Sequence, residues 1–225
     1  MNRNIMVCGK WPLTLDEGNT GFFQHLHNAQ KNAQCFERAL QGLPTGRTVV
    51  EHYGGVGVGS TVIQHVLRPK SHVIYEIDDQ CIEQLRRHIP RATVRYGNAN
   101  TLMGEIRADI LVLDHPYHTV RSHESLGRQW NAVFAQKPLA VVWPDGSARR
   151  FHLHRGLYDV ALGCAVTTER EYLEAYSELL WKRWGYAIRV AAGHSYTYLQ
   201  VTEGAPSVIE FHRWSPVTRT VERVP

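Results

Sequence analysis

The most informative stretch of the chain is residues 48–60, which read TVVEHYGGVGVGS. Its β-branched start predicts a short strand, and the glycines that follow predict a tight turn into a helix. Such a turn lets the backbone approach a ligand closely, with the N-terminus of the helix directed at it. The stretch therefore predicts a ligand-binding turn at the end of a strand.

The spacing of the glycines distinguishes this turn from two common nucleotide-binding turns. Gly55, Gly57 and Gly59 are each separated by one valine. In the dinucleotide fingerprint G-x-G-x-x-G, counted from Gly55, the third glycine would fall on Ser60. A P-loop needs Gly-Lys followed by Ser or Thr, and none follows these glycines. The spacing disfavours a nicotinamide oxidoreductase and excludes a P-loop enzyme.

Strands and helices alternate along most of the chain. After the first strand, apolar and β-branched runs predict strands at residues 72–77, 92–96, 109–113, 139–143, 186–191, 196–202 and 208–214. Helices are predicted at residues 22–40, 60–67, 79–89, 125–135 and 169–184, and no structure is predicted for residues 145–166. This alternation predicts an α/β fold: a Rossmann-like, doubly wound sheet of seven mostly parallel strands with an antiparallel C-terminal hairpin.

The composition is that of a soluble globular protein. Of the 225 residues, 43% are hydrophobic and 20% are charged, and no apolar run approaches the roughly 20 residues that span a bilayer. The N-terminus lacks the pattern of a signal peptide, so we expect a cytoplasmic protein with no membrane partner. The four cysteines form no Cys-x-x-Cys pair, and we predict no metal site. The net charge of +4 permits an anionic partner without requiring one.

Polar residues stand where two further strands are predicted to end. Glu76 lies 21 positions after Gly55, and a carboxylate there can accept both hydrogen bonds of a ribose diol. Ile77 can pack against a purine face, and Asn98, after the next strand, can read an adenine edge. Three successive strand ends thus offer a cradle for a methionyl or phosphate group, a ribose acceptor and a purine contact.

Together, residues 49–59, 73–78 and 97–99 resemble the S-adenosylmethionine-binding half of class I methyltransferases. The resemblance covers about residues 45–145 and rests on the order and spacing of these pieces at consecutive strand ends. Many members carry an aspartate where this chain has Asn98, and an acidic residue where it has Tyr53, whose contact with the cofactor's amino group Glu51 would take over. The resemblance implies S-adenosylmethionine as the cofactor, held by Glu51, Gly55, Gly57, Gly59, Glu76, Ile77 and Asn98.

We expect a single methyltransferase-like domain over residues 1–225, because the sequence contains no linker that would divide the chain. It would consist of an N-terminal helical segment (residues 1–44), a cofactor-binding half (residues 45–145) and a substrate-side half (residues 146–225).

The turn Asp114-His115-Pro116-Tyr117 follows the predicted fourth strand of the sheet and is similar to the turn of amino-group, N6-adenine-type methyltransferases. That turn reads Asp or Asn, two prolines and an aromatic residue. An exocyclic amine needs two acceptors to orient its lone pair and an aromatic surface to hold its ring. The Asp114 side chain and the His115 carbonyl would be the acceptors, and Tyr117 the stacking face. His115 departs from the family pattern, so an ordinary acidic turn at the mouth of the site remains the alternative.

The function implied by the resemblance is S-adenosylmethionine-dependent methyl transfer to an exocyclic amino group of a nucleic-acid base, with DNA or RNA as partner. Two alternatives remain open: methylation of a small molecule or protein side chain, and a non-catalytic binding protein on the same fold. A basic surface beside Asp114 would favour nucleic acid. The best sequence candidate for it is residues 149–155, whereas Arg86, Arg87, Arg91 and Arg95 are interpreted as a solvated face.

Overall fold

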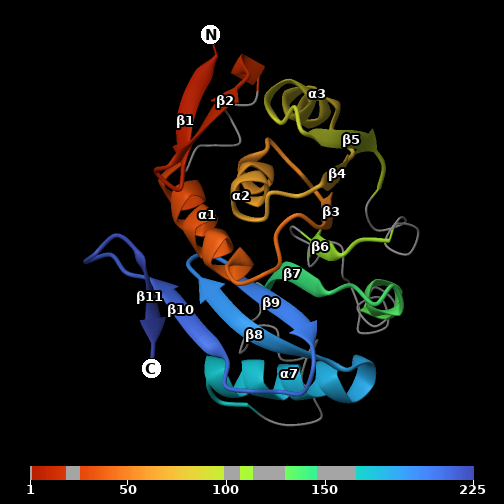
Figure 1. The fold of residues 1–225 in the computed structure, drawn as a ribbon. Coiled ribbons are helices and arrows are strands. Elements are labelled where there is room, and N and C mark those ends of the chain that lie inside the picture. The colour runs from red at the N-terminus through yellow and green to blue at the C-terminus, as the bar shows by residue number, and fades with distance from the viewer. Residues whose placement is uncertain (1, 19–25, 99–106, 114–129, 146–165) are drawn as a thin grey trace.

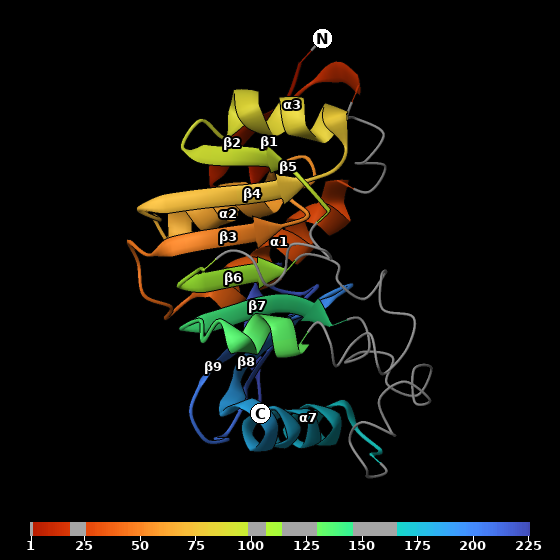
Figure 2. The ribbon, with the colours of Figure 1, turned by 90° about the vertical axis from the view of Figure 1, so that its right-hand side faces the viewer.

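A computed structural model describes residues 2–18, 26–98, 107–113, 130–145 and 166–225 of the chain (Figure 1). Within these residues the strands form a two-stranded sheet and a nine-stranded sheet. The large sheet runs through the middle of the molecule, with helices on both of its faces (Figure 2).

The small sheet is an N-terminal hairpin that the sequence analysis did not anticipate. Strands β1 (Arg3–Val7) and β2 (Trp11–Leu15) pair antiparallel, where residues 1–44 were expected to be helical. Ile5, Val7, Leu13 and Leu15 are buried on the same face of the hairpin, which is the period of two that a half-buried strand requires. Helix α1 (Leu26–Leu40) follows, within the predicted helical range.

The large sheet has the strand order β11-β10-β8-β9-β7-β6-β3-β4-β5. Its strands are β3 (Thr48–His52), β4 (Ser71–Glu76), β5 (Ala92–Tyr96), β6 (Ile110–Leu113), β7 (Ala140–Asp145), β8 (Tyr186–Gly193), β9 (Thr197–Glu203), β10 (Glu210–Trp214) and β11 (Val221–Val224). Five neighbouring strands, β7, β6, β3, β4 and β5, are mutually parallel. Strand β9 lies between β7 and β8 and is antiparallel to both. The sheet has nine strands instead of the predicted seven. The predicted strand at residues 208–214, β10, pairs in parallel with β8, and β11, which was not predicted, pairs antiparallel with β10.

Helices cover the two faces of the sheet, and neighbouring residues of each central strand pack on opposite faces. Val49 and Ile110 lie in one buried cluster with α1, α2 (Val58–Val66) and α3 (Asp79–His88). Val50 and Leu111 lie in the other, with α7 (Glu169–Trp184) and the helical residues 130–135. Strands buried on both faces explain the continuous apolar runs in the sequence, as expected for a doubly wound sheet.

The parallel strands give the sheet two chemically different edges. We call the edge where β3, β4, β5, β6 and β7 end the C-terminal edge, and the edge where they begin the N-terminal edge. In doubly wound folds, ligands bind at the C-terminal edge. Glu76 is the last residue of β4 at that edge, and the predicted glycine turn and Asn98 follow β3 and β5 there.

Candidate functional site

The glycine turn connects β3 to α2, and its three predicted glycines have different surroundings. At Gly55, where φ is 53°, a Cβ atom would meet nothing within 4 Å. At Gly57, where φ is 95°, a Cβ would lie 3.3 Å from Leu85 and Ile89 of the core. At Gly59 it would lie 3.2 Å from the Glu51 carboxylate. Gly55 therefore leaves open space at the turn, whereas the other two glycines are needed for packing.

Gly54 was not among the predicted site residues, yet it is the most tightly packed glycine of the turn. A Cβ there would come within 2.4 Å of the Ile74 side chain and 3.0 Å of Leu85. The turn can lie this close to β4 and α3 only because the residue has no side chain. The one available signal was the pair of adjacent glycines in the sequence.

Glu76 is the last residue of β4 and joins that strand to the glycine turn. Its Oε2 accepts a hydrogen bond from the Gly55 amide at 2.8 Å, and its Oε1 accepts from the amides of Ile77 at 2.7 Å and Asp78 at 3.1 Å. A carboxylate offers about four lone-pair positions, so roughly one stays available for a further donor. The structure thus brings two predicted residues together and holds the carboxylate in one orientation.

Ile77 and Asn98 complete the surface around Glu76. The Gly97 amide donates to the Glu76 carbonyl at 3.0 Å, which brings the end of β5 against the end of β4. Ile77 is 53% exposed, although it directly follows the largely buried Glu76, and Asn98 is also exposed. An exposed apolar side chain next to a fixed acceptor is the combination that a nucleoside needs, with a base to cover and a sugar to bind.

The start of α3 lies beside this site. Asp78 is its N-cap, and its side chain accepts a hydrogen bond from the Cys81 amide at 2.9 Å. Burial raises the pKa of the Cys81 thiol to about 12, and the charges of Asp78 and Glu76 raise it further in the same direction. This thiol is therefore protonated at neutral pH and is not poised to act as a nucleophile.

Glu51 has partners other than those the resemblance implies. Its carboxylate is 2% exposed and lies beneath the first turn of α2. Its Oε2 accepts a hydrogen bond from the Ser60 hydroxyl at 2.7 Å and lies 3.0 Å from Nε2 of His72. The group ties β3, α2 and β4 together, so the structure does not bring Glu51 to the open surface beside Gly55. Its predicted contact with the cofactor stays a prediction.

The predicted catalytic residues Asp114, His115 and Tyr117 lie outside the described residues. The strand that precedes them, β6, ends at Leu113 next to His52 of β3. The chain therefore enters the predicted turn from the strand adjacent to the glycine turn.

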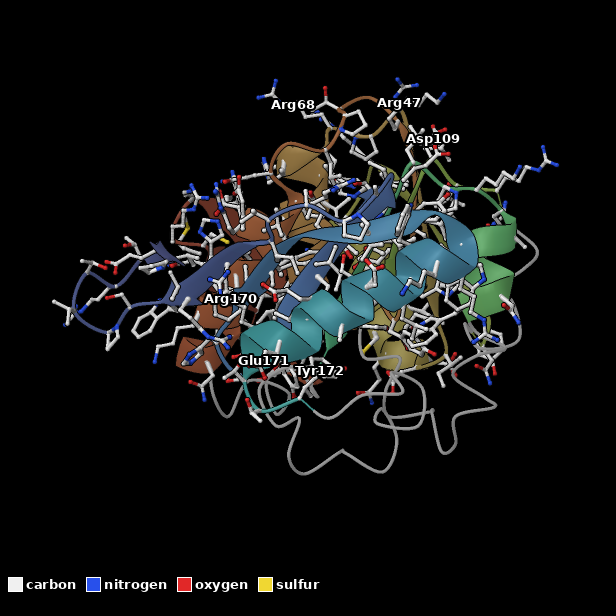
Figure 3. All side chains as sticks on the ribbon, turned by 90° about the horizontal axis from the view of Figure 1, so that it is seen from below. Arg47, Arg68, Asp109, Arg170, Glu171 and Tyr172 are labelled. Atoms are coloured by element: carbon white, nitrogen blue, oxygen red, sulfur yellow. The ribbon has the colours of Figure 1, made fainter. Side chains whose placement is uncertain are left out.

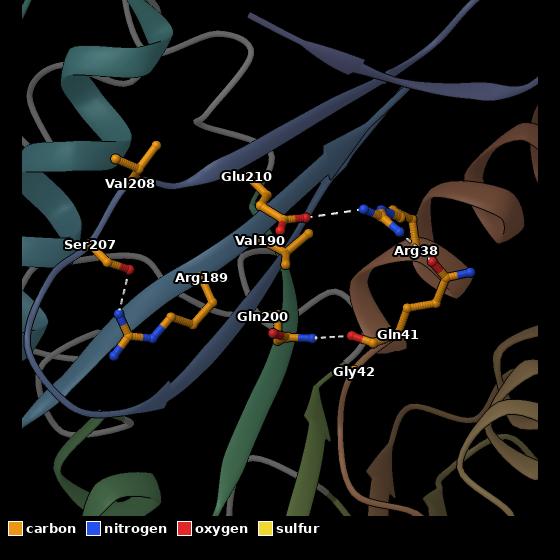
Figure 4. Close-up of a pocket in the computed structure, with 9 residues that line it drawn as sticks. All are labelled: Arg38, Gln41, Gly42, Arg189, Val190, Gln200, Ser207, Val208 and Glu210. Carbon is orange, nitrogen blue, oxygen red and sulfur yellow. Dashed lines mark hydrogen bonds and ion pairs between the residues drawn. The ribbon is translucent and has the colours of Figure 1, made fainter.

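A cavity of about 390 Å³ lies elsewhere, between the end of α1 and strands β8 to β10 (Figure 4). Its two arginines already donate hydrogen bonds to neighbouring protein groups. Arg38 donates to Glu210 at 3.0 Å and to Gln41 at 2.6 Å, and Arg189 donates to Ser207 at 2.7 Å and to the Ala205 carbonyl at 2.8 Å. This cavity is remote from Glu76, and its polar groups serve the packing of α1 on the sheet.

No protein-family model matches the sequence, and no curated protein matches it. Solved structures do match. Trm1 from Pyrococcus horikoshii, in complex with S-adenosyl-L-methionine, is 10% identical over 98% of this chain and 68% of its own, with a TM-score of 0.62. Human N-acetylserotonin methyltransferase, in complex with SAM, is 12% identical over 84% of this chain and 57% of its own, with a TM-score of 0.54. The methyltransferase domain of bacterial CtHen1-CN is 13% identical over 77% of this chain and 99% of its own, with a TM-score of 0.53.

The chain has the fold of these methyltransferases. At 10–13% identity the likeness is one of fold, and the chain spans little more than half the length of the human enzyme. In this methyltransferase fold, Gly55, Glu76, Ile77 and Asn98 share the C-terminal edge. Within the described ranges there is no group of three or more residues that could hold a metal ion. The helices of those ranges include none that could cross a membrane.

Proposed function

We propose that this protein is an S-adenosylmethionine-dependent methyltransferase whose donor site lies at the C-terminal edge of β3, β4 and β5. The observation that carries the proposal is the Glu76 carboxylate, held by the Gly55 amide at 2.8 Å beside the open space of that glycine and the exposed Ile77. The fold shared with methyltransferases supports it.

The described residues fit such a donor in distinct roles. Gly55 lets the backbone approach the methionyl part, Glu76 accepts from the ribose, Ile77 covers the purine and Asn98 reads its edge. Gly57 and Gly59 shape the turn, and Glu51 acts through Ser60 and His72 to hold the turn against β4. S-adenosylmethionine carries an activated methyl group, so the protein need only align donor and acceptor for in-line displacement.

For the acceptor, we propose an exocyclic amino group of a DNA or RNA base. The Asp114 carboxylate and the His115 carbonyl would accept the two amine hydrogens, and Tyr117 would stack on the base. Two facts support this role: the likeness of residues 114–117 to the turn of amino-group methyltransferases, and the end of β6 at Leu113, beside β3. Stacking of a base on an aromatic ring contributes about 1–3 kcal/mol, enough to hold an extruded base.

The proposed donor is tested by isothermal titration with S-adenosylmethionine, S-adenosylhomocysteine and NAD. We expect the first two to bind and NAD not to bind. NAD binding tighter than S-adenosylhomocysteine would contradict the proposal, and so would the absence of binding by both sulfur compounds. The acceptor is tested separately, by transfer of a labelled methyl group to DNA, RNA, protein and small amines.

A further inference from the structure

The N-terminal edge of the sheet carries six exposed cations, distributed over the connections that precede five adjacent strands. We call this set the basic edge: Arg47 before β3, Arg68 and Lys70 before β4, Arg91 before β5, Arg107 before β6 and Lys137 before β7. In the sequence these residues are scattered over 91 positions and form no charge run. The parallel sheet gathers them.

The strand starts are in register, which lines the cations up. Thr48 pairs with Ser71, and His72 pairs with Ala92 on the next strand. The Lys70 amide also donates to the Arg47 carbonyl at 3.1 Å, so these two connections are joined directly. Neighbouring strands are about 4.8 Å apart, so the row across five strands is roughly 19 Å long. Figure 3 shows Arg47 and Arg68 directed outward from this edge, on the opposite side of the molecule from Arg170.

Carboxylates do not balance the basic edge. Asp109 lies 4.0 Å from Lys70, but one of its oxygens also accepts a hydrogen bond from the Thr48 amide. Within the part of the chain that the structure describes, the other five cations have no ion-pair partner. Arg38 and Arg213, by contrast, are paired with Glu210 and Glu169.

His65, near the end of α2, is close enough to the basic edge for its pKa to respond to these cations. Its pKa is lowered, first by partial burial and then by the charges of Arg91 and Arg68. Cations from two different connections thus act on the same ring. Mutual repulsion of this kind destabilises the folded protein, and an anionic partner relieves it.

We propose that the basic edge binds the phosphate backbone of a nucleic-acid strand. The exposed cations of such a row can each contact a phosphate of one strand and release its counterion. A single linear row fits a strand better than a membrane, which spreads its charge over a plane. The row stops at β7, because Glu203 at the end of β9 lies on the next strand and brings a negative charge.

This inference goes beyond the proposed function, because the basic edge lies at the starts of the strands and Glu76 lies at the end of β4. Binding of nucleic acid at the basic edge does not depend on methyl transfer. If the donor site is where we propose, a long nucleic acid would contact both edges, the basic edge by its backbone only.

Fluorescence anisotropy tests the proposal with labelled 20-nucleotide RNA and DNA strands of one sequence, between 50 and 200 mM KCl. The variant Arg47→Gln/Arg68→Gln/Lys70→Gln is expected to weaken binding at least tenfold at 50 mM and to reduce the slope of log K against log salt by about 2, because three phosphate contacts are lost. The matched control Arg3→Gln/Arg219→Gln/Arg223→Gln removes three exposed cations elsewhere and is expected to change affinity less than twofold.

Several outcomes would overturn the proposal. These are equal weakening in both triple variants, unchanged binding in the edge variant, and tighter edge-dependent binding to phosphatidylserine vesicles than to either oligonucleotide. A preference for RNA over DNA above tenfold would also overturn it, because phosphates alone do not distinguish the two. Titration of the edge variant with S-adenosylhomocysteine separates this proposal from the proposed function. Lost nucleic-acid binding with normal cofactor binding supports both the basic edge and the donor site. A wild-type protein that binds nucleic acid through this edge but binds no cofactor overturns only the proposed function.

Discussion

The two edges of the central sheet differ in the sign and the burial of their charged side chains. At the C-terminal edge, the Glu76 carboxylate is largely buried and accepts hydrogen bonds from three backbone amides. At the N-terminal edge, six cations are exposed and only Lys70 has a carboxylate within 4 Å among the described residues. The first arrangement fixes one acceptor for a small ligand, and the second offers diffuse charge to a long one.

The winding of the fold explains this segregation. Helices α2 and α3 each begin at the C-terminal edge and end at the N-terminal edge. Carboxylates are stabilised near helix N-termini and cations near helix C-termini. Glu76, Asp78 and Asp79 surround the start of α3, whereas Arg68 and Arg91 follow the ends of α2 and α3. The dipoles of α2 and α3 therefore favour carboxylates at the C-terminal edge and cations at the N-terminal edge.

The largest expected effect is a loss of stability at the C-terminal edge, where Gly57 is needed for packing. Gly57→Val places a branched residue at a φ of 95° against Leu85 and Ile89. Backbone strain and overpacking together should cost about 2–6 kcal/mol of unfolding free energy. Gly55→Ala, in open space, should cost only about 1–2 kcal/mol. Urea denaturation compares the two; a Gly57→Val protein as stable as wild type that has lost cofactor binding would show that this glycine contacts the ligand instead.

The next effect separates chemistry from binding at the same edge. Asp114→Ala should lower methyl transfer by about 100–1,000-fold, because the amine loses a charged acceptor in the transition state. The affinity of Asp114→Ala for S-adenosylhomocysteine, measured by isothermal titration, should change less than twofold. A matching loss of cofactor affinity would place Asp114 in the donor site.

Two companion variants identify what the turn contributes. Tyr117→Phe should be mild and Tyr117→Ala severe, because stacking uses the ring and not the hydroxyl. His115→Pro restores the family pattern and should keep activity. If it abolishes activity in a folded, cofactor-binding protein, the imidazole itself has a role and the acceptor is a group that must be deprotonated.

A smaller effect concerns Glu76. Glu76→Ala should weaken S-adenosylhomocysteine binding by about 2–3 kcal/mol, measured by titration calorimetry. It should also lower thermal stability, because three amides lose their acceptor. Asp78→Ala is the control: it removes the N-cap of α3, which costs about 1 kcal/mol of stability, and should leave binding intact. Equal affinities in both variants would show that the ribose is held elsewhere.

The smallest effect concerns a carboxylate near the start of α7 that serves only its own helix. Hydrogen bonds from Thr167, then from the Thr168 amide, lower the pKa of Glu171. A lowered folded-state pKa means that its stabilisation is present above the ordinary value of 4.5 and is lost as the pH falls through the folded pKa. Thermal melts between pH 6 and 3 should therefore show a shallower acid loss for Glu171→Gln than for wild type. Identical pH profiles would contradict this, and cofactor binding at pH 7 should be unchanged.

The sequence by itself determined the local chemistry of the C-terminal edge. The β-branched strand before Gly54, the β4 and β5 segments, the helix predicted at residues 169–184 and the position of Glu76 at the end of β4 are confirmed, because strand propensity, glycine turns and helix periodicity act over a few residues. The doubly wound α/β sheet followed from the alternation of such local signals.

Only the tertiary structure decided what depends on distant pairing. It placed the predicted strand at residues 208–214, β10, in parallel beside β8, and it added β11. It also formed the N-terminal hairpin and buried Glu51 against Ser60 and His72 instead of leaving it at the surface. Arg91, interpreted from sequence as part of a solvated face, is exposed, and the structure places it among the cations of five neighbouring connections. Each of these features joins residues far apart in the chain. Local propensity does not encode which strand starts, helix faces and side chains the folded sheet brings together.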